Sequence, residues 1–264
     1  MALNNPVIVT ALFDIGRDQW DKFTMSYNTY LWWMRNTLSL DSNIVIYTEK
    51  KFINDIKNLR REFDPDFKKT IIEVIELEDL ECYKRYFNSL QTLMQSNQFK
   101  EKVSFPDVPE MSKPLYNIIM FNKIFFLQDT INKRHFDNDV VIWADAGGLR
   151  EDVSTYSFKK FPDLNKLNWF QDKIIFFSHN SKFEITDKEF YSLSQIRNIQ
   201  GTCFMVPSSR INELSDLVIE TIDESISAGY IGSDEKIFDI CYTKNPSLFS
   251  LIVCGWREYF NILR

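Results

Sequence analysis

Short apolar runs alternate with longer amphipathic stretches along most of the chain. The short runs have the length and content of buried strands, at residues 7–13, 43–48, 70–77, 140–143, 174–178, 201–206 and 248–253. Between them, apolar positions recur at helical spacing over residues 20–36, 49–63, 79–100, 112–133, 187–196, 208–228 and 232–242. Residues 102–111 contain two prolines and are predicted to form a loop. This alternation predicts an α/β fold with a mainly parallel central sheet flanked by helices.

Length and composition point to one domain. The chain has 264 residues, of which 44% are apolar, enough for one substantial core or two small ones. No internal repeat and no low-complexity linker divides the sequence. We therefore expect a single domain over residues 1–264.

Charge and cysteine usage narrow the partners and the compartment. The net charge is −6 and no basic stripe stands out, so nucleic acid is not an expected partner. No signal peptide and no transmembrane segment is visible in the sequence, although peripheral contact with a membrane stays open. The four cysteines are far apart, with no CxxC pair, which favours free thiols in a reducing compartment. A cytoplasmic protein is expected.

The segment DVVIWADAGGLRE, residues 139–151, carries the strongest sign of chemistry. A buried strand ends there in Asp145, followed by Gly147 and Gly148. In open α/β sheets, ligands bind outside the carboxyl ends of the strands. Asp145 is therefore predicted to meet a phosphate, a metal ion or a sugar hydroxyl. The alternative is an ordinary turn or capping aspartate.

Two other segments place charged side chains at the ends of predicted elements. Asp14, Gly16 and Arg17 follow the first strand, and the arginine offers a fork of donors to an anion. An ordinary turn with a surface salt bridge is the alternative. Asp234 and Glu235 stand at a helix start, where they could act as a base or contact an acceptor. Favourable interaction with the helix dipole is the alternative for them.

His179 ends a predicted strand and is a candidate ligand or acid–base group, with a structural role as the alternative. HExxH, Walker A, GxGxxG and GxSxG motifs are all missing from the sequence. Their absence weakens the metalloprotease, P-loop kinase, dinucleotide-enzyme and α/β-hydrolase interpretations.

Several motifs together resemble a known family. FNKIFFL at residues 121–127, followed by FDNDVVIWADAG at residues 136–147, resembles the region before the DxD motif of GT-A glycosyltransferases. VTALFDIGR at residues 9–17, NIVIYT at residues 43–48 and WADAG at residues 143–147 resemble the HtrL/YibB (WlaTC-like) family. The resemblance extends over about residues 6–255. Members of this bacterial family are associated with lipopolysaccharide gene clusters and are regarded as candidate glycosyltransferases.

This resemblance implies a GT-A-like, Rossmann-like fold and an enzyme. Such an enzyme moves a sugar from a nucleotide-sugar donor, a UDP-sugar first of all, to a saccharide or other hydroxyl acceptor in surface polysaccharide synthesis. Carried over by motif and by position in the chain, the expected donor-binding residues are Asp14, Gly16, Arg17, Lys123, Asp145, Gly147 and Arg150. Asp234 or Glu235 would orient or deprotonate the acceptor hydroxyl, and His179 and Trp256 are candidates on the acceptor side.

The chain departs from the DxD pattern at one position, because Gly147 stands where the second acid would be. The resemblance implies Mn²⁺ or Mg²⁺ at Asp145, alone or helped by Glu151 or Asp152. Alternatively, no metal is needed and Arg17, Lys123 or Arg150 balances the diphosphate charge. Two other functions stay open: a non-catalytic nucleotide- or saccharide-binding protein, and a nucleotidyltransferase.

Overall fold

One mixed sheet forms the centre of the computed structural model, which describes residues 5–103, 105–167, 172–183 and 198–264. Its strands are β1 (Pro6–Leu12), β2 (Asn43–Thr48), β3 (Thr70–Val74), β4 (Val140–Ala144), β5 (Ile174–Ser178), β6 (Ile199–Pro207) and β7 (Phe249–Val253). Their order is β3-β2-β1-β4-β6-β5-β7. All neighbours pair in parallel except β6, which runs antiparallel to both β4 and β5. The prediction of a mainly parallel sheet is confirmed, and each predicted strand is present.

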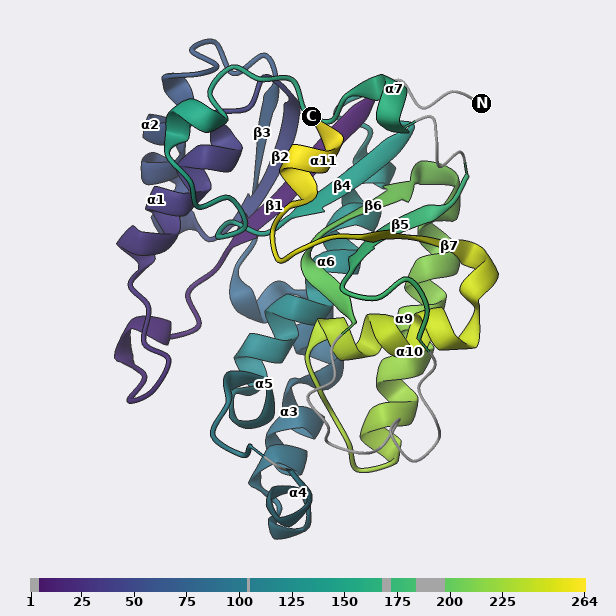
Figure 1. Ribbon diagram of the computed structural model, residues 1–264. Helices are drawn as coiled ribbons and strands as arrows, with labels where there is room; N and C mark the ends of the chain where they lie inside the picture. Colours follow the sequence, from purple (N-terminus) through teal and green to yellow (C-terminus); the bar gives the residue numbers. More distant parts are fainter. Residues whose placement is uncertain (1–4, 104, 168–171, 184–197) are drawn as a thin grey trace.

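Helices cover both faces of the sheet (Figure 1). One face packs against α3 (Glu81–Gln95), α6 (Pro114–Lys133), α9 (Ile211–Ser227) and α10 (Asp234–Lys244). The other face packs against α1 (Tyr27–Leu38), α2 (Ile53–Arg61), α7 (Leu164–Leu167) and α11 (Tyr259–Leu263). Side chains alternate along each strand, so Val7 and Val9 join the first core while Ile8 joins the second. The apolar runs of the five inner strands are therefore buried on both faces, as expected for central strands, whereas the edge strands β3 and β7 are partly exposed.

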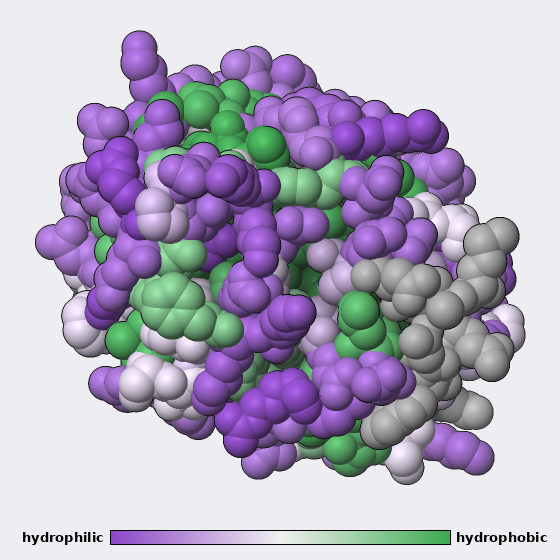
Figure 2. All heavy atoms as spheres, turned by 90° about the horizontal axis from the view of Figure 1, so that it is seen from above, coloured by the Kyte–Doolittle hydropathy of each residue, from purple (hydrophilic) through white to green (hydrophobic). Residues whose placement is uncertain are grey.

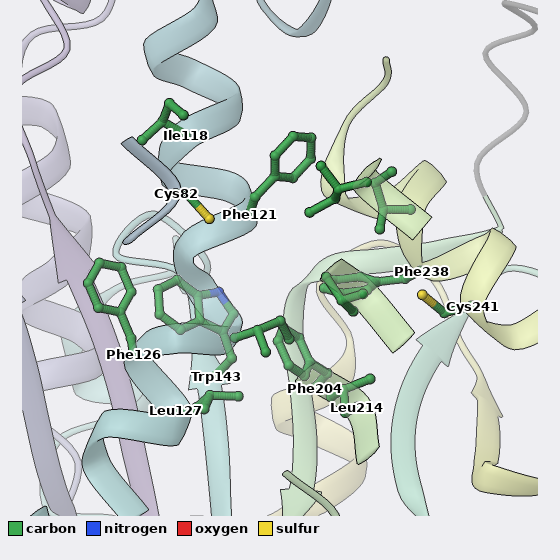
Figure 3. Packing of buried hydrophobic residues seen from close by; sticks show 14 of the residues in the cluster. Cys82, Ile118, Phe121, Phe126, Leu127, Trp143, Phe204, Leu214, Phe238 and Cys241 are labelled. Atoms are coloured by element: carbon green, nitrogen blue, oxygen red, sulfur yellow. The ribbon is translucent and has the colours of Figure 1, made fainter. Parts of the chain in front are cut away.

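Aromatic side chains connect α6 and α10 to the strands beneath them. Figure 3 shows Trp143 of β4 between Phe126 of α6 and Phe204 of β6. The Phe126 and Trp143 rings are stacked with centroids 6.0 Å apart, and Phe204 meets Phe238 of α10 at 5.1 Å. Ring pairs of this kind add stabilisation beyond simple burial. They fix the two helices relative to the tips of β4 and β6.

Three predicted elements differ from the structure. The first helix begins at Tyr27 instead of residue 20, because Ser26 adopts an extended conformation and accepts the backbone N–H of Thr29 at 3.1 Å. The helix predicted over residues 79–100 is interrupted at Ser96, whose hydroxyl in the same way caps α4 (Asn97–Lys102). The predicted loop at 102–111 contains the start of a short helix, α5 (Pro109–Ser112). The predicted helix at 187–196 lies outside the described residues.

The surface shows little continuous apolar area on the face drawn in Figure 2, where hydrophobic atoms form separate patches among hydrophilic ones. Among the described helices, none is long and apolar enough to cross a membrane. The four cysteines are free, and Cys82, Cys203 and Cys241 are buried.

Candidate functional site

A cavity of about 260 Å³ opens at the edge where β1 and β4 end and β6 begins. Because β6 is antiparallel, its first residues lie beside the carboxyl end of β4. Of the residues predicted from the sequence, those that line the cavity are Arg17, Lys123, Asp145, Gly147, Arg150, Asp234, Glu235 and Trp256. Asp14, Gly16 and His179 do not line it.

An ammonium group lies between two carboxylates at the floor of this cavity. Lys123 Nζ lies 2.9 Å from Asp145 Oδ1 and 2.7 Å from Asp234 Oδ2. It also donates to the carbonyl oxygen of Gly201 at 2.9 Å, so its three N–H groups each have an acceptor. The Lys123 side chain is 1% exposed, whereas that of Asp145 is 26% exposed and faces the cavity. Three segments distant in sequence therefore meet at one buried cation.

Burial and charge act against each other in this cluster. Burial alone would lower the pKa of Lys123, but Asp145 and Asp234 outweigh it and raise that pKa above its ordinary value. Burial raises the pKa of Asp145, Lys123 opposes the rise, and the nearby charge of Asp234 adds to it. The lysine is therefore held as a permanent cation at neutral pH.

Asp145 is oriented by its own strand and by β6. Trp143 Nε1 donates to Asp145 Oδ1 at 2.6 Å, and the backbone N–H of Asp145 donates to the Thr202 carbonyl at 2.9 Å. Within the described part of the chain, the other carboxylate oxygen, Oδ2, has no hydrogen-bond partner. A side chain at Gly148 would bring Cβ within 2.5 Å of the Tyr259 hydroxyl, so the tight turn after Asp145 requires glycine. Asp145 thus presents one free oxygen to the cavity.

Gly201 makes room for Asp234. A Cβ at this position would lie 2.3 Å from Asp234 Oδ2, so the carboxylate would have to move away from Lys123. The next residue of α10, Glu235, is 5% exposed, and its Oε1 accepts the Gly201 N–H at 3.5 Å. Ser233 occupies the N-cap position of α10 without a side-chain capping bond. Asp234 is thus directed at Lys123, while Glu235 joins it at the cavity wall.

Three arginines, Arg17, Arg150 and Arg257, also line the cavity. Arg17 donates through Nη1 to the Tyr30 hydroxyl, and its Cζ lies 5.5 Å from the ring centroid of Trp20. Arg150 lies 3.7 Å over the ring of Trp33 and donates through Nε to the Gly147 carbonyl at 2.8 Å. Arg257 lies 5.6 Å from the Trp256 ring centroid. Each guanidinium is thus oriented by an aromatic ring.

Asp14 and Gly16 shape the loop that carries Arg17. Asp14 Oδ1 accepts the N–H of Gly16 at 2.8 Å, and Oδ2 pairs with Lys51 at 2.7 Å. Gly16 has φ +71°, a conformation that favours glycine. Asp14 does not line the cavity, and both of its carboxylate oxygens already have partners. These contacts hold the loop that carries Arg17.

His179 and Trp256 stack on each other, with ring centroids 6.0 Å apart and an interplanar angle of 15°. Both side chains are exposed, and only Trp256 lines the cavity. The backbone N–H of His179 pairs with the Asn198 carbonyl at 2.9 Å. The two near-parallel rings therefore form an aromatic stack that reaches the cavity through Trp256.

Several lining residues were not predicted to be at a site. Tyr30 and Trp33 lie in the segment 20–36, for which only a helix was predicted, and both line the cavity. Tyr116 gave no signal, because nothing in its local sequence marks a strand end or a glycine turn. Arg257 was missed although the predicted strand at residues 248–253 and Gly255 come just before it. Lys123 was predicted as a contact for a diphosphate, but its ammonium is shared by two carboxylates.

The residues present do not fit a divalent metal ion. No group of three or more His, Cys, Asp or Glu side chains that could hold a metal occurs among residues 5–103, 105–167, 172–183 and 198–264. Lys123 already lies against Asp145 and Asp234, and Gly147 offers no carboxylate. Glu151 and Asp152 do not line the cavity, and Asp152 Oδ1 caps the N–H of Ser154 at 2.9 Å. The donor set thus resembles an ion-pair cluster more than a metal site.

Sequence comparisons identify the family and one relative of this chain. Residues 4–264 match a family model described as "Bacterial protein of unknown function (HtrL_YibB)". Protein HtrL of Escherichia coli (strain K12) is 24% identical, over 99% of this chain and 92% of that protein.

Among solved structures, mouse xyloside xylosyltransferase 1 in its apo form superposes with a TM-score of 0.51 and 12% identity, covering 97% of this chain and 90% of that one. The galactosyltransferase LgtC, in complex with donor and acceptor sugar analogs, gives a TM-score of 0.48 and 11% identity over 94% and 73% of the two chains. The likeness to the xylosyltransferase is one of fold, and it confirms the GT-A-like architecture.

Proposed function

Because this chain belongs to the HtrL_YibB family and shares its fold with a glycosyltransferase, we propose that it transfers a sugar from a nucleotide-sugar donor to a hydroxyl acceptor. The observation that carries this proposal is the cavity itself, where one free oxygen of Asp145 faces a wall of arginines at the carboxyl edge of the sheet. A nucleotide sugar needs a carboxylate oxygen that accepts hydrogen bonds from its hydroxyl groups and, beside it, guanidinium groups that donate hydrogen bonds to its phosphates.

The residues divide into donor and acceptor roles in this proposal. Asp145 Oδ2 accepts a hydroxyl of the ribose or of the donor sugar. Asp234, already paired with Lys123, is a positioning residue, and Glu235 is the candidate base for the acceptor hydroxyl. The acceptor oxygen bonds to the anomeric carbon as the bond to the diphosphate breaks. The diphosphate leaves with the electron pair, and the hydroxyl proton passes to the base.

A saccharide acceptor is supported by the stacked rings of His179 and Trp256 at the cavity rim. The apolar face of a sugar packs on such a surface, whereas its hydroxyls reach toward the cavity. We extend the proposal to surface polysaccharide or lipopolysaccharide synthesis in the cytoplasm, with a UDP-sugar as the first donor to test. The four free cysteines support that compartment. Trp256→Ala should weaken acceptor use several-fold, seen as a raised KM for the acceptor with donor binding unchanged.

The function is tested by a thermal-shift screen against UDP-, GDP- and CMP-sugars, followed by transfer assays with the donor that binds. A ligand at about a hundred times its Kd adds roughly 2.7 kcal/mol of stability, an easily measured shift. Asp145→Asn should reduce transfer at least tenfold, and Asp172→Asn, on an exposed residue paired with Arg210, serves as the matched control. A folded Asp145→Asn protein with full activity would remove this residue from the mechanism.

A non-catalytic saccharide- or nucleotide-binding protein is the second candidate. Gly147 in place of an acid favours it, as does the pairing of Asp145 and Asp234 with Lys123. It predicts binding of a nucleotide sugar with no hydrolysis and no transfer to any acceptor over hours.

A further inference from the structure

The charges that line the cavity are not balanced by one another. Its cations are Arg17, Lys123, Arg150 and Arg257, and its carboxylates are Asp145, Asp234 and Glu235. Lys123 is the cation that two of the carboxylates share. In the described part of the chain, the arginine ion pairs involve Arg35, Arg60, Arg85 and Arg210, and none of the three cavity arginines. Three guanidinium groups therefore face the cavity without a carboxylate partner.

The three arginines lie close enough to repel one another. Burial lowers the pKa of Arg150 below its ordinary value, and the positive charges of Arg257 and Arg17 lower it further. The buried Nε atom of Arg257 has no hydrogen-bond partner among the residues that the structure describes. Buried polar groups without a partner are rare in native proteins and call for an explanation. An anion between these side chains would satisfy the free donors and relieve the repulsion.

The cluster at the cavity floor supplies the second observation. Lys123 Nζ, 2.9 Å from Asp145 Oδ1 and 2.7 Å from Asp234 Oδ2, already neutralises the charges that would attract a metal ion. A Mg²⁺ or Mn²⁺ ion takes about six oxygen ligands, whereas Asp145 and Asp234 each already give one carboxylate oxygen to Lys123. The positive charges of Lys123 and of the three cavity arginines would also repel such an ion.

We propose that Arg17, Arg150 and Arg257 bind the diphosphate of the donor directly, without a divalent metal ion. Lys123 supplies at the two carboxylates the positive charge that a metal would otherwise bring. The inference rests on the proposed function for the identity of the ligand, a nucleoside diphosphate. Planar guanidinium forks match phosphate oxygens in pairs, so three of them hold a diphosphate in a defined orientation.

The experiment measures binding of UDP, GDP and inorganic pyrophosphate by isothermal titration calorimetry, once with EDTA and once with Mn²⁺. We expect at least one probe to bind in EDTA, with a Kd that changes less than about twofold when Mn²⁺ replaces EDTA. Arg150→Ala and Arg257→Ala should each weaken that binding about ten- to hundredfold, as the loss of charge-assisted hydrogen bonds predicts. Arg210→Ala, an exposed and ion-paired arginine outside the cavity lining, is the matched control and should bind as the wild type does.

Two results would overturn the inference. One is wild-type binding that requires Mn²⁺, and loss of this Mn²⁺-dependent binding in Asp145→Asn would place the ion on that carboxylate. The other is wild-type affinity in Arg150→Ala and Arg257→Ala proteins that remain folded by circular dichroism. Pyrophosphate binding in EDTA without binding of any nucleotide would retain the diphosphate site and contradict the proposed function. Nucleotide binding in EDTA without sugar transfer would retain the inference and favour the binding-protein alternative.

Discussion

Two fully buried cations lie in different parts of this molecule and have different partners. Arg60 of α2 and Lys123 of α6 are each 1% exposed. Arg60 donates to the carbonyl oxygens of Leu40 and Ser42 at 2.9 and 3.2 Å, and to the Thr70 hydroxyl at 2.7 Å. Its nearest carboxylate oxygen, on Asp64, is 3.8 Å away. Lys123 meets two carboxylates at shorter distances.

The partners decide what each buried charge does. Burial lowers the pKa of Arg60 despite Asp64, whereas the carboxylates around Lys123 outweigh burial and raise its pKa. Arg60 connects the chain between α1 and β2 to α2, and it does not line the cavity. Lys123 lies at the floor of the cavity. A buried charge therefore marks a site only where its partners also face a cavity that a ligand can enter.

The largest effect is expected for Lys123→Met. Removing the ammonium leaves Asp145 and Asp234 beside each other without a counter-charge, and breaking a buried ion pair from one side costs about 3–5 kcal/mol. Urea unfolding should show this loss, and calorimetry should show weakened nucleotide binding in the fraction that folds. Adding Asp234→Asn should recover part of the stability. Wild-type stability in Lys123→Met would contradict the role of this ion cluster.

Arg60→Met should destabilise the fold by a similar or slightly smaller amount, about 3–4 kcal/mol, because buried carbonyl groups lose their donor. The folded fraction should bind nucleotides with unchanged affinity, since Arg60 does not line the cavity. Urea unfolding and calorimetry on the same samples separate the two quantities. If both variants lost affinity equally, the contrast between the two cations would disappear.

A buried carboxylate, Asp239 of α10, extends the comparison to a negative charge. Burial raises the pKa of Asp239 to about 6, although Asn198 and Ile199 donate hydrogen bonds to it. The folded state therefore binds a proton that the unfolded state has released between about pH 4 and pH 6. Its contribution to stability is complete below pH 4 and falls by about 2–3 kcal/mol as the pH rises through 6.

Asp239→Asn should remove this decline. The difference between wild type and variant in urea unfolding, measured from pH 4 to pH 7, isolates it from other titrating groups. A difference that does not vary with pH would show that Asp239 titrates in the folded state as it does in the unfolded chain.

The smallest effect is expected for Gly201→Ala, which displaces the ion cluster without removing a charge. The added Cβ would lie 2.3 Å from Asp234 Oδ2, so the carboxylate must move from Lys123. Overpacking of this kind costs about 1–3 kcal/mol. Sugar-transfer activity should fall clearly even in samples in which urea unfolding shows that the protein remains folded. Gly229→Ala, with no atom within 4 Å of its Cβ but with φ +73°, controls for backbone effects alone.

Much of the architecture was predictable because its causes are local. The apolar runs that gave the five inner strands are buried on both faces, and the predicted bounds of β2 and β5 equal those of the structure. Asp145 was found from the end of its strand and the glycines that follow. The first helix was placed too early, because aromatic spacing continues through Trp20 and Phe23 although Ser26 caps the helix. Helical periodicity alone does not show at which capping residue a helix begins.

The sequence by itself determined the strands, the mainly parallel sheet and the position of Asp145, since each depends on neighbouring residues. Only the tertiary structure decided that β6 is antiparallel and that its first residues lie beside Asp145. It also decided that Lys123, 111 positions from Asp234, is shared by two carboxylates and is therefore not free for a ligand. Arg257 joins Arg17 and Arg150 in the same way, from the far end of the chain. These relations arise from packing and electrostatics between distant segments, which no local pattern records.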